Sequence, residues 1–287
     1  MTSGFSPAET PTPPFPLSSD WSPLFSLVDE VAERQRRDFG RLASDLKADG
    51  SLITDCDRWS DATLAAGLAQ IFPTDGLLSE EGSTTVPDAP GFWVVDPLDG
   101  TTNFSVGLPI WAISMARIDH GRPVAALLDV PPLGQRLLAL RGQGVWSNGQ
   151  PLAPPAPPRH GCRCASLCSR SIGALRRVAE PFPAKTRMLG VASLNLLGVG
   201  LGTMAAALEA TPRIWDLAAV WLILEELGCR LHPLGSDPFP LQPGADLGAA
   251  PYPLLAARDE EQLRRFLPWG LALNPGQEGR GTATPAA

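Results

Sequence analysis

The sequence predicts a layered α/β protein, because helix-like and strand-like apolar patterns occur together in one chain of 287 residues. Near the N-terminus, apolar residues follow the i, i+3, i+4, i+7 spacing of an amphipathic helix, at Leu24, Leu27, Val28 and Val31. Residues 91–95 form a short apolar run that stops at Asp96-Pro97, which is typical of a buried strand feeding a loop. A hydrophobic fraction of 44% with 18% charged residues provides for a well-filled core.

Composition divides the chain into two halves between two tails. Residues 1–18 are rich in Pro, Ser and Thr and are predicted to be a flexible lead-in. Residues 19–150 are predicted to form an N-terminal α+β half that carries most candidate metal ligands. A proline-dense seam follows, and residues 151–270 are predicted to form a C-terminal α/β half. Residues 271–287 are predicted to be a disordered tail, because Gly, Pro, Thr and Ala dominate its composition.

Within the halves, periodicity predicts individual elements in chain order. A turn-rich stretch at 47–57 precedes an expected helix over 61–71. Turn signals then separate a series of expected strands, over 91–95, 111–118, 124–130 and 136–141, and a hairpin turn is expected at 146–149. In the C-terminal half, mostly apolar helices are expected over 194–208 and 215–227.

Charge and cysteine usage limit the functional class. The formal net charge of −7 argues against a protein that coats nucleic acid. No apolar run is long enough to span a bilayer, so no membrane partner is expected. Five cysteines, an odd number, indicate reduced thiols and a cytoplasmic location.

Acidic residues stand beside turns or strand ends in four separated segments. They are Asp57, Glu80, Glu81, Asp96, Asp99 and Asp216. Two Asp residues three positions apart at a strand end can hold adjacent Mg²⁺ ions, which prefer oxygen ligands. Pro97 restricts the loop between them, and the amides that follow Gly100 can open a helix toward a phosphate. Asp-Pro and Asp-Gly are also typical of plain turns, so this stretch alone admits a structural interpretation.

The other acidic segments also have structural interpretations. Asp57 could be a helix N-cap, and Glu80 with Glu81 could form a solvated loop. Asp216 begins a helix that looks apolar almost all round. A carboxylate in that position needs a cap, a partner or a metal ion.

Taken together, these segments resemble the inositol monophosphatase family. Residues 93–104, Trp-Val-Val-Asp-Pro-Leu-Asp-Gly-Thr-Thr-Asn-Phe, closely resemble the family's signature. Residues 215–219 followed by 225–228 resemble its second signature. The remaining two motifs are matched by residues 47–51 with Thr54 and Asp57, and by Ser79-Glu80-Glu81. The resemblance covers residues 20–268, with the motifs in the family's order.

The resemblance implies a layered α-β-α-β-α sandwich of two packed halves, assembled as a homodimer. It implies Mg²⁺-dependent, lithium-sensitive hydrolysis of a small phosphate monoester, with two or three Mg²⁺ ions per active site. By matching positions, Glu80, Asp96 and the backbone carbonyl of Leu98 would hold one ion. Asp96, Asp99 and Asp216 would hold a second, and a weaker third ion would share Glu80.

The same resemblance implies catalytic and substrate-binding roles. Thr101, with Glu80 and Asp57 nearby, would position or deprotonate the attacking water, and the amides of Gly100, Thr101 and Thr102 would hold the phosphate. Substrate contacts are implied for Gly190, Val191, Ala192, Ser193 and Glu209. Glu209 would hydrogen-bond the hydroxyls of a polyol, although it could also be a plain helix-end acid.

Inositol monophosphate is the expected substrate. The alternatives are histidinol phosphate, fructose 1,6-bisphosphate and 3'-phosphoadenosine 5'-phosphate, since fold and motif do not determine the substrate. A relative that binds cations or phosphate without catalysis is an alternative from another class.

Three features depart from the family pattern or fall outside it. Ser79 replaces a usual glycine, which puts the conformation of the glutamate loop in question. A trio of cysteines has no fourth zinc ligand close by in sequence and is interpreted as unrelated thiols, at Cys162, Cys164 and Cys168. Four arginines are interpreted as solvated helix positions, at Arg170, Arg176, Arg177 and Arg187.

Overall fold

The structure is a computed structural model that describes residues 21–41, 44–47, 52–156 and 163–273. Its helices are α1 (Ser22–Asp38), α2 (Asp55–Ile71), α3 (Thr101–Val106), α4 (Ile172–Arg177), α5 (Ala192–Gly200), α6 (Ile214–Glu226) and α7 (Glu260–Leu271). Short 3₁₀ turns lie at η1 (Pro131–Leu133) and η2 (Ser169–Ser171).

Two larger sheets and one short strand pair make up the β-structure. The larger sheet has the strand order β3 (Gly76–Ser79), β4 (Gly91–Asp99), β5 (Ala112–Asp119), β6 (Arg122–Val130), β7 (Gln135–Leu140), β8 (Gly144–Ser147) and β9 (Gln150–Leu152). The smaller has the order β11 (Lys185–Arg187), β10 (Cys164–Leu167), β12 (Ala206–Glu209), β14 (Leu254–Ala257) and β13 (Arg230–Pro233). An antiparallel pair is formed by β1 (Ser44–Leu46) and β2 (Leu52–Thr54).

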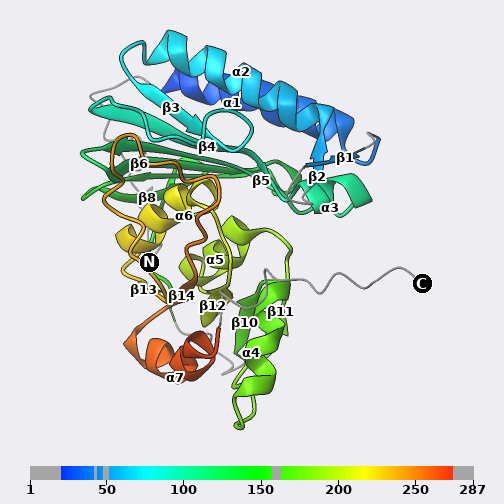
Figure 1. The fold of residues 1–287 in the computed structure, drawn as a ribbon, viewed down its shortest axis with the longest axis vertical. Coiled ribbons are helices and arrows are strands. Elements are labelled where there is room, and N and C mark those ends of the chain that lie inside the picture. The colour runs from blue at the N-terminus through cyan, green and yellow to red at the C-terminus, as the bar shows by residue number, and fades with distance from the viewer. Residues whose placement is uncertain (1–20, 42–43, 48–51, 157–162, 274–287) are drawn as a thin grey trace, which may run out of the picture.

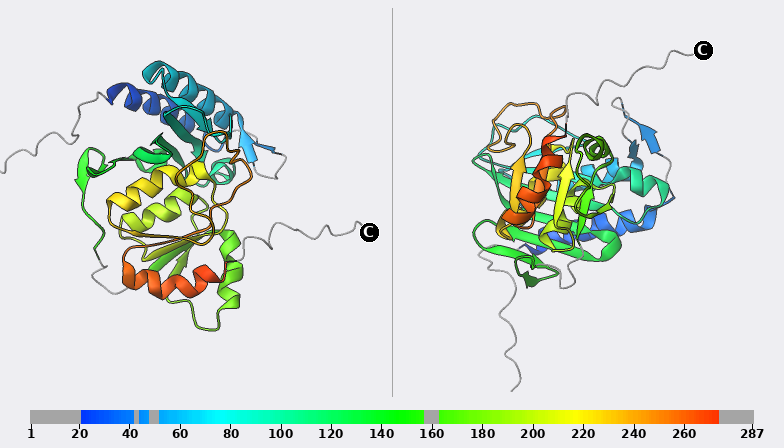
Figure 2. Two further views of the ribbon diagram at one scale, coloured as in Figure 1. Left: turned by 60° about the vertical axis from the view of Figure 1, so that its left-hand side comes forward. Right: turned by 90° about the horizontal axis from the view of Figure 1, so that it is seen from below.

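These elements stack in five layers, which Figure 1 shows from top to bottom and the left view of Figure 2 shows from another side. Helices α1 and α2 cover one face of the larger sheet. Helices α5 and α6 lie between the two sheets, with α6 against β5 and β6 and α5 against β12. Helices α4 and α7 cover the outer face of the smaller sheet. This arrangement confirms the predicted α-β-α-β-α sandwich.

Strand β4 is buried along its whole length because helices cover both faces of its sheet. Phe92 and Val94 belong to the apolar cluster around α5 and α6, whereas Trp93 and Val95 belong to the cluster beneath α1 and α2. Successive side chains of a strand point to opposite faces, so a strand covered on both sides reads as a continuous apolar run. The strand therefore carries its last residues, Asp96 to Asp99, into the interior.

Most predicted elements are present, with shifted ends. The helix predicted from the Leu24 pattern is α1, and all four pattern residues are buried on it. The predicted strands correspond to β4, β5, β6 and β7. The predicted hairpin turn joins β8 to β9 through Asn148 (φ +47°) and Gly149 (φ +78°), the left-handed pair that a tight hairpin turn requires.

Two expectations about secondary structure were wrong. Helix α2 begins at Asp55 rather than at 61, because Thr54 caps it and accepts a hydrogen bond from the backbone N–H of Asp57. The apolar stretch over 194–208 is not one helix. Helix α5 ends at Gly200, and β12 then pairs with β10 and β14. A stretch that is apolar almost throughout carries no periodicity that separates a buried helix from a buried strand.

The predicted seam near residue 151 falls between the two sheets. The larger sheet is built from residues 76–152 and the smaller from residues 164–257. Helix α6, which lies in the C-terminal half, nevertheless packs on the larger sheet. Helix α7 reaches Leu271, the first residue of the predicted tail, and Leu273 is buried. The predicted lead-in of residues 1–18 and the rest of the tail, residues 274–287, lie outside the described residues.

None of the described helices is both long and apolar enough to cross a membrane.

Candidate metal and phosphate site

The end of β4 leads through Gly100 into α3 and places two carboxylates in the interior. Asp96 and Asp99 flank a register shift between β4 and β5, and both are buried. The backbone N–H of Leu98 donates to Oδ1 of Asp96 over 2.9 Å, which fixes the loop from within. Gly100 has φ +109°, and a Cβ there would lie 2.7 Å from Cγ2 of Val191. A residue with a side chain is therefore excluded at the junction between strand and helix.

The third carboxylate comes from the C-terminal half. Asp216 is the third residue of α6, and its Oδ2 accepts a hydrogen bond of 2.7 Å from the backbone N–H of Arg213. The hydroxyl of Ser114 in β5 donates to the carbonyl oxygen of Trp215 over 2.9 Å and ties the start of α6 to the larger sheet. As a result, ligand atoms of Asp96, Asp99 and Asp216 lie within 4.8 Å of one another.

The electrostatics of this triad favour a positively charged ligand. Burial, followed by the charges of Glu80, Asp99 and Asp216, raises the pKa of Asp96 well above its usual range. Burial raises the pKa of Asp99 to about 6, although the hydrogen bond from the backbone N–H of Ser193 opposes the shift. No Lys or Arg of the described chain forms an ion pair with any of the three. Clustered buried carboxylates with no cationic partner fit a site for hard divalent cations.

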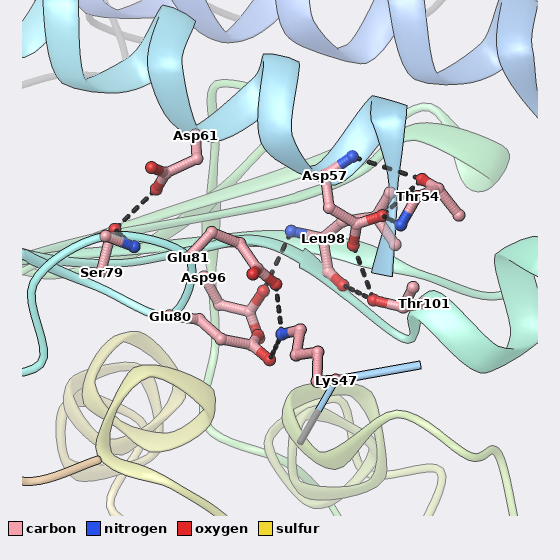
Figure 3. Close-up of polar contacts among 11 residues, drawn as sticks. Lys47, Thr54, Asp57, Asp61, Ser79, Glu80, Glu81, Asp96, Leu98 and Thr101 are labelled. Carbon is pink, nitrogen blue, oxygen red and sulfur yellow. Dashed lines mark hydrogen bonds and ion pairs between the residues drawn. The ribbon is translucent and has the colours of Figure 1, made fainter. Parts of the chain in front are cut away.

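Asp57 and Thr101 form a second polar group on the same side of β4 as Asp96 of the triad (Figure 3). The hydroxyl of Thr101 lies 2.7 Å from Oδ1 of Asp57 and 3.2 Å from the carbonyl oxygen of Leu98. The other carboxylate oxygen of Asp57 accepts the backbone N–H of Thr54 over 2.8 Å. Asp57 thus completes the capping box of α2 and also reaches Thr101. The structural and functional interpretations of this residue are both compatible with its position.

Glu80 follows β3 and lies close to Asp96, opposite the side chain of Lys47 (Figure 3). The Nζ atom of Lys47 lies 2.8 Å from Oε1 of Glu80 and also contacts Oε1 of Glu81. Ser79, where the family has glycine, donates from its hydroxyl to Oδ1 of Asp61 over 2.6 Å and accepts the backbone N–H of Gly82 over 3.0 Å. The serine therefore anchors the loop to α2 while Glu80 still faces the triad.

Several predicted substrate residues surround a cavity of about 250 Å³ next to the triad. Its lining includes Gly190, Val191, Ala192 and Glu209 together with Asp99 and Asp216. Ser193 takes part differently, because its backbone N–H donates to Oδ2 of Asp99 over 2.8 Å. Thr102, predicted to contribute a backbone amide, is the exposed second residue of α3.

Glu209 is buried at the end of β12 and is not an exposed helix-end acid. Its Oε1 accepts a hydrogen bond of 2.7 Å from Nδ2 of Asn195. Burial, opposed by Asn195 and reinforced by the charges of Asp99 and Asp216, raises the pKa of Glu209 well above its usual range. The carboxyl group can therefore donate or accept hydrogen bonds at the cavity wall.

Sequence reasoning assigned no role to Asn195 or Gln35, both of which support the site. Each is a buried polar residue within an apolar helix face. A polar residue among apolar ones at helical spacing was the sequence feature that could have indicated a buried hydrogen-bonding role. Arg170, interpreted as a solvated helix position, is exposed in η2 and lines the cavity beside Glu209. Arg187 is also exposed, but it lies in strand β11 and not in a helix.

Two cysteines of the trio, Cys164 and Cys168, belong to the described part of the chain. Cys162 lies outside the described residues, and the described chain contains one group of candidate metal ligands, the Asp triad. Cys168 has a free thiol that lies 3.0 Å from the Ser171 hydroxyl and accepts the backbone N–H of Ala210 over 3.2 Å.

Fold and site together define a protein built for divalent-cation and phosphate chemistry. The sequence model of the inositol monophosphatase family matches residues 23–263. The chain belongs to the inositol monophosphatase family.

Several proteins similar in sequence to this chain are named as phosphatases. A histidinol-phosphatase of Mycobacterium tuberculosis is 32% identical over 229 residues, which cover 73% of this chain and 85% of the relative. An inositol-1-monophosphatase of Rhizobium meliloti is 34% identical over 225 residues, covering 71% and 82%. These relatives support phosphatase activity, and their names carry different substrates.

Solved structures share the fold. The extragenic suppressor protein suhB of Bartonella henselae superposes with a TM-score of 0.71 at 25% identity, covering 89% of this chain and 98% of that one. An IMPase/NADP phosphatase complexed with Mg²⁺ and phosphate superposes with a TM-score of 0.70 at 22% identity, covering 85% and 93%.

Proposed function

We propose that this protein is a Mg²⁺-dependent phosphate monoester hydrolase that acts on a small polyol phosphate, with inositol monophosphate as the preferred candidate. The observation that carries the proposal is the meeting of Asp96, Asp99 and Asp216 at the start of α3. Three clustered carboxylates beside a helix start provide for a cation and a phosphate in one place.

The donor set fits two or three Mg²⁺ ions. Glu80, Asp96 and the carbonyl oxygen of Leu98 would hold one ion, and Asp96, Asp99 and Asp216 a second, with a weaker third near Glu80. All the side-chain donors are carboxylates, which Mg²⁺ prefers over nitrogen or sulfur ligands. When bound, the ions supply Lewis-acid stabilisation of the charge that develops on the phosphate.

The chain's own residues orient the attacking water and hold the phosphate. With its hydrogen directed to Asp57, the Thr101 oxygen presents lone pairs that can accept a hydrogen bond from water. The carboxylates of Asp57 and Glu80 then provide acceptors for the proton that this water releases. The amides of Gly100, Thr101 and Thr102 would hold the phosphate oxygens at the start of α3.

Recognition of the alcohol portion would fall to the cavity beside the triad. Gly190, Val191, Ala192 and Ser193 would position the substrate, and Glu209 would hydrogen-bond its hydroxyls. Histidinol phosphate is the second candidate, since a histidinol-phosphatase is among the relatives and a buried carboxyl group also suits an ammonium group.

Phosphate release from four substrates tests the proposal. Inositol 1-phosphate, histidinol phosphate, fructose 1,6-bisphosphate and 3'-phosphoadenosine 5'-phosphate would each be assayed with Mg²⁺ and with chelator. We expect Mg²⁺-dependent release with the highest kcat/KM for inositol 1-phosphate. A higher kcat/KM for histidinol phosphate would make that compound the preferred substrate in place of inositol monophosphate. Stoichiometric Mg²⁺ binding without turnover of any of the four would favour a non-catalytic relative instead.

We also propose that the protein acts as a homodimer in the cytoplasm. The family resemblance supports the dimer, and the four free cysteines of the described chain support a reducing compartment. Light scattering of the purified protein would test the dimer through its mass. Fractionation of cells that express the full chain would test its location.

A further inference from the structure

Residues 189–193 form one wall of the cavity beside the triad, and we call them the wall segment. Gly190, Val191 and Ala192 line the cavity, and none of the three has a polar side chain. The wall segment runs from the loop after β11 into the first residues of α5. Its position therefore depends on the contacts that neighbouring side chains make with its backbone.

Both backbone groups of Leu189 are bound by buried asparagines. Asn103 in α3 donates from Nδ2 to the carbonyl oxygen of Leu189 over 2.7 Å. The backbone N–H of Leu189 donates to Oδ1 of Asn195 in α5 over 3.2 Å. Gly190, with φ +74°, then packs so closely on Asn103 that a Cβ would lie 2.8 Å from its Oδ1. The two amides therefore fix the start of the wall segment.

Asn195 also binds Glu209, because its Nδ2 donates to Oε1 of that residue over 2.7 Å. The chemistry of the partners determines how the amide is oriented. A backbone N–H can only donate, so the amide oxygen faces Leu189, and the amide nitrogen, which is also only a donor, faces Glu209. The carbonyl oxygen of Asn195 accepts the hydroxyl of Ser166 in β10 over 2.7 Å, which holds α5 on the smaller sheet. One side chain thus joins the wall segment to the acid.

The contact with Asn195 also determines what the carboxyl group of Glu209 can offer to a substrate. Oε1 receives a hydrogen bond from a nitrogen that only donates, so Oε1 acts as an acceptor there. Oε2 is the oxygen that Asn195 leaves for a substrate hydroxyl. A carboxyl group held at one oxygen presents the other in a fixed direction, which is the requirement for oriented recognition.

We propose that Asn195 is a positioning residue that sets the preference for polyol phosphates, by holding the Glu209 carboxyl group and the wall segment in one arrangement. The inference rests on the proposed function and deepens it. With 1% of its surface exposed, Asn195 offers little to a substrate directly, so it acts through Glu209. Its effect should reach the alcohol portion of the substrate and spare the triad, because neither residue is a proposed metal ligand.

A cycle of single and double variants tests this role. Asn195→Asp keeps the shape of the side chain and an oxygen for the Leu189 N–H, but it places an acceptor opposite Oε1 of Glu209. Glu209→Gln supplies an amide at that point. The combined variant therefore exchanges the two groups and restores a donor facing an acceptor. Asn195→Leu, which removes both contacts without adding an acid, is a second variant in case Asn195→Asp does not fold.

Asn148→Asp is the matched control. The side chain of Asn148 accepts the backbone N–H of Arg136 over 2.8 Å and donates to the carbonyl oxygen of Gly134 over 3.0 Å. The same chemical change is thus made at another amide that joins two backbone segments. Asn148 lies in the turn between β8 and β9 and does not line the cavity. We expect wild-type KM values in this variant, and circular dichroism checks that each variant is folded.

We expect Asn195→Asp to raise KM for inositol 1-phosphate about tenfold, the effect of losing one charge-assisted hydrogen bond. The KM for para-nitrophenyl phosphate, which lacks ring hydroxyls, should stay within about twofold of wild type. The combined variant with Glu209→Gln should also show about a tenfold rise, because both changes act on one contact. A combined rise of about 100-fold would overturn the inference, since Asn195 would then act independently of Glu209. An unchanged KM in Asn195→Asp, or an equal rise for both substrates, would also overturn it.

Hydrogen exchange of the metal-free protein tests the wall segment without any turnover. Asn195→Leu should speed amide exchange over residues 189–193 about tenfold, whereas Asn195→Asp should stay close to wild type because it keeps an oxygen for the Leu189 N–H. Unchanged exchange in Asn195→Leu would overturn the positioning role even if the protein is an active phosphatase.

Calorimetry separates failure of this inference from failure of the proposed function. If the wild type hydrolyses no phosphate ester, the proposed function fails, and the same cycle is measured as Kd for inositol 1-phosphate in chelator. A weaker Kd in Asn195→Asp that the Glu209→Gln change does not weaken further would support the inference without catalysis. No binding of inositol 1-phosphate by the wild type would overturn both.

Discussion

The side chain of Gln35 donates a hydrogen bond of 2.7 Å from Nε2 to the carbonyl oxygen of Pro97. Its Oε1 accepts a hydrogen bond of 3.0 Å from Nε1 of Trp111, and Gln35 is fully buried. Helix α1 thus holds the Asp96–Asp99 loop from behind, although it contributes no residue to the cavity beside the triad. The first helix of the chain thereby helps to shape the candidate metal site.

Replacing Gln35 by Leu should weaken both the fold and the site. The change leaves the Pro97 carbonyl and the Trp111 N–H buried without partners, at a cost of about 1–3 kcal/mol in the free energy of unfolding. Denaturant unfolding would measure this loss, and calorimetry should show weaker Mg²⁺ binding. Gln143→Leu is the control, because Gln143 is exposed in the turn after β7. Unaltered Mg²⁺ affinity in Gln35→Leu would show that the contact serves stability alone.

Asp96→Asn should abolish turnover and yet stabilise the metal-free protein. The loss of several kcal/mol of charge stabilisation corresponds to about 10³-fold or more in kcat. The carboxylate removed is also buried and repelled by Glu80, Asp99 and Asp216, so its loss relieves an unfavourable charge. Thermal unfolding in chelator should show a higher Tm than wild type, with no further rise on adding Mg²⁺. Near-normal activity would rule out Asp96 as a shared ligand.

The metal-free protein should lose stability as the pH rises. The pKa of Asp99 is raised to about 6 in the folded state, against an ordinary value of 3.8. Below about 4 both states are protonated, and above about 6 the folded state must ionise a buried acid, so the free energy of unfolding falls between these values. Asp96, Asp216 and Glu209 have pKa values raised in the same direction and extend the fall to higher pH.

Thermal unfolding in chelator at about pH 5 and about pH 8 measures this effect. We expect the lower Tm at the higher pH, and we expect Mg²⁺ to restore more stability there because it binds the ionised carboxylates. A Tm in chelator that rises with pH over this range would contradict the assignment of these groups as raised acids.

Thr101→Val should reduce kcat without reducing Mg²⁺ affinity. The hydroxyl orients water toward Asp57 in the proposed reaction, and removing one group of this kind costs about 10²–10⁴-fold in rate. Its side chain is not a proposed ligand, so calorimetry should give wild-type Mg²⁺ binding. Thr74→Val, in an exposed loop, is the matched control. If Mg²⁺ affinity and kcat fell equally, the role of Thr101 would be to support the metal site and not to orient water.

Glu209→Gln should change substrate preference more than chemistry. The amide keeps a hydrogen-bonding group opposite Asn195 but removes the charge from the cavity wall. We expect KM for inositol 1-phosphate to rise by about tenfold, the effect of losing one charge-assisted hydrogen bond. Hydrolysis of para-nitrophenyl phosphate, which lacks ring hydroxyls, should change little. Equal losses on the two substrates would argue against a polyol contact.

Much of the fold was predictable, because its strongest signals are local. The Leu24 pattern, the β4 run and the hairpin turn at Asn148 each depend on residues a few positions apart. Prediction failed over 194–208, where β12 and the residues of α5 after Ala192 are buried and mostly apolar. There the choice between helix and strand depends on distant partners, since β12 exists only by pairing with β10 and β14.

By itself, the sequence determined the layered α/β class and the chemical identity of the candidate ligands. Motifs and apolar periodicity are local features, which depend on residues a few positions apart. Only the tertiary structure decided which of these residues meet. Asp96 and Asp216 are far apart in the chain and converge because α6 packs against the sheet that carries β4. The same packing buries Glu209. Such proximity depends on long-range contacts, which no local pattern encodes.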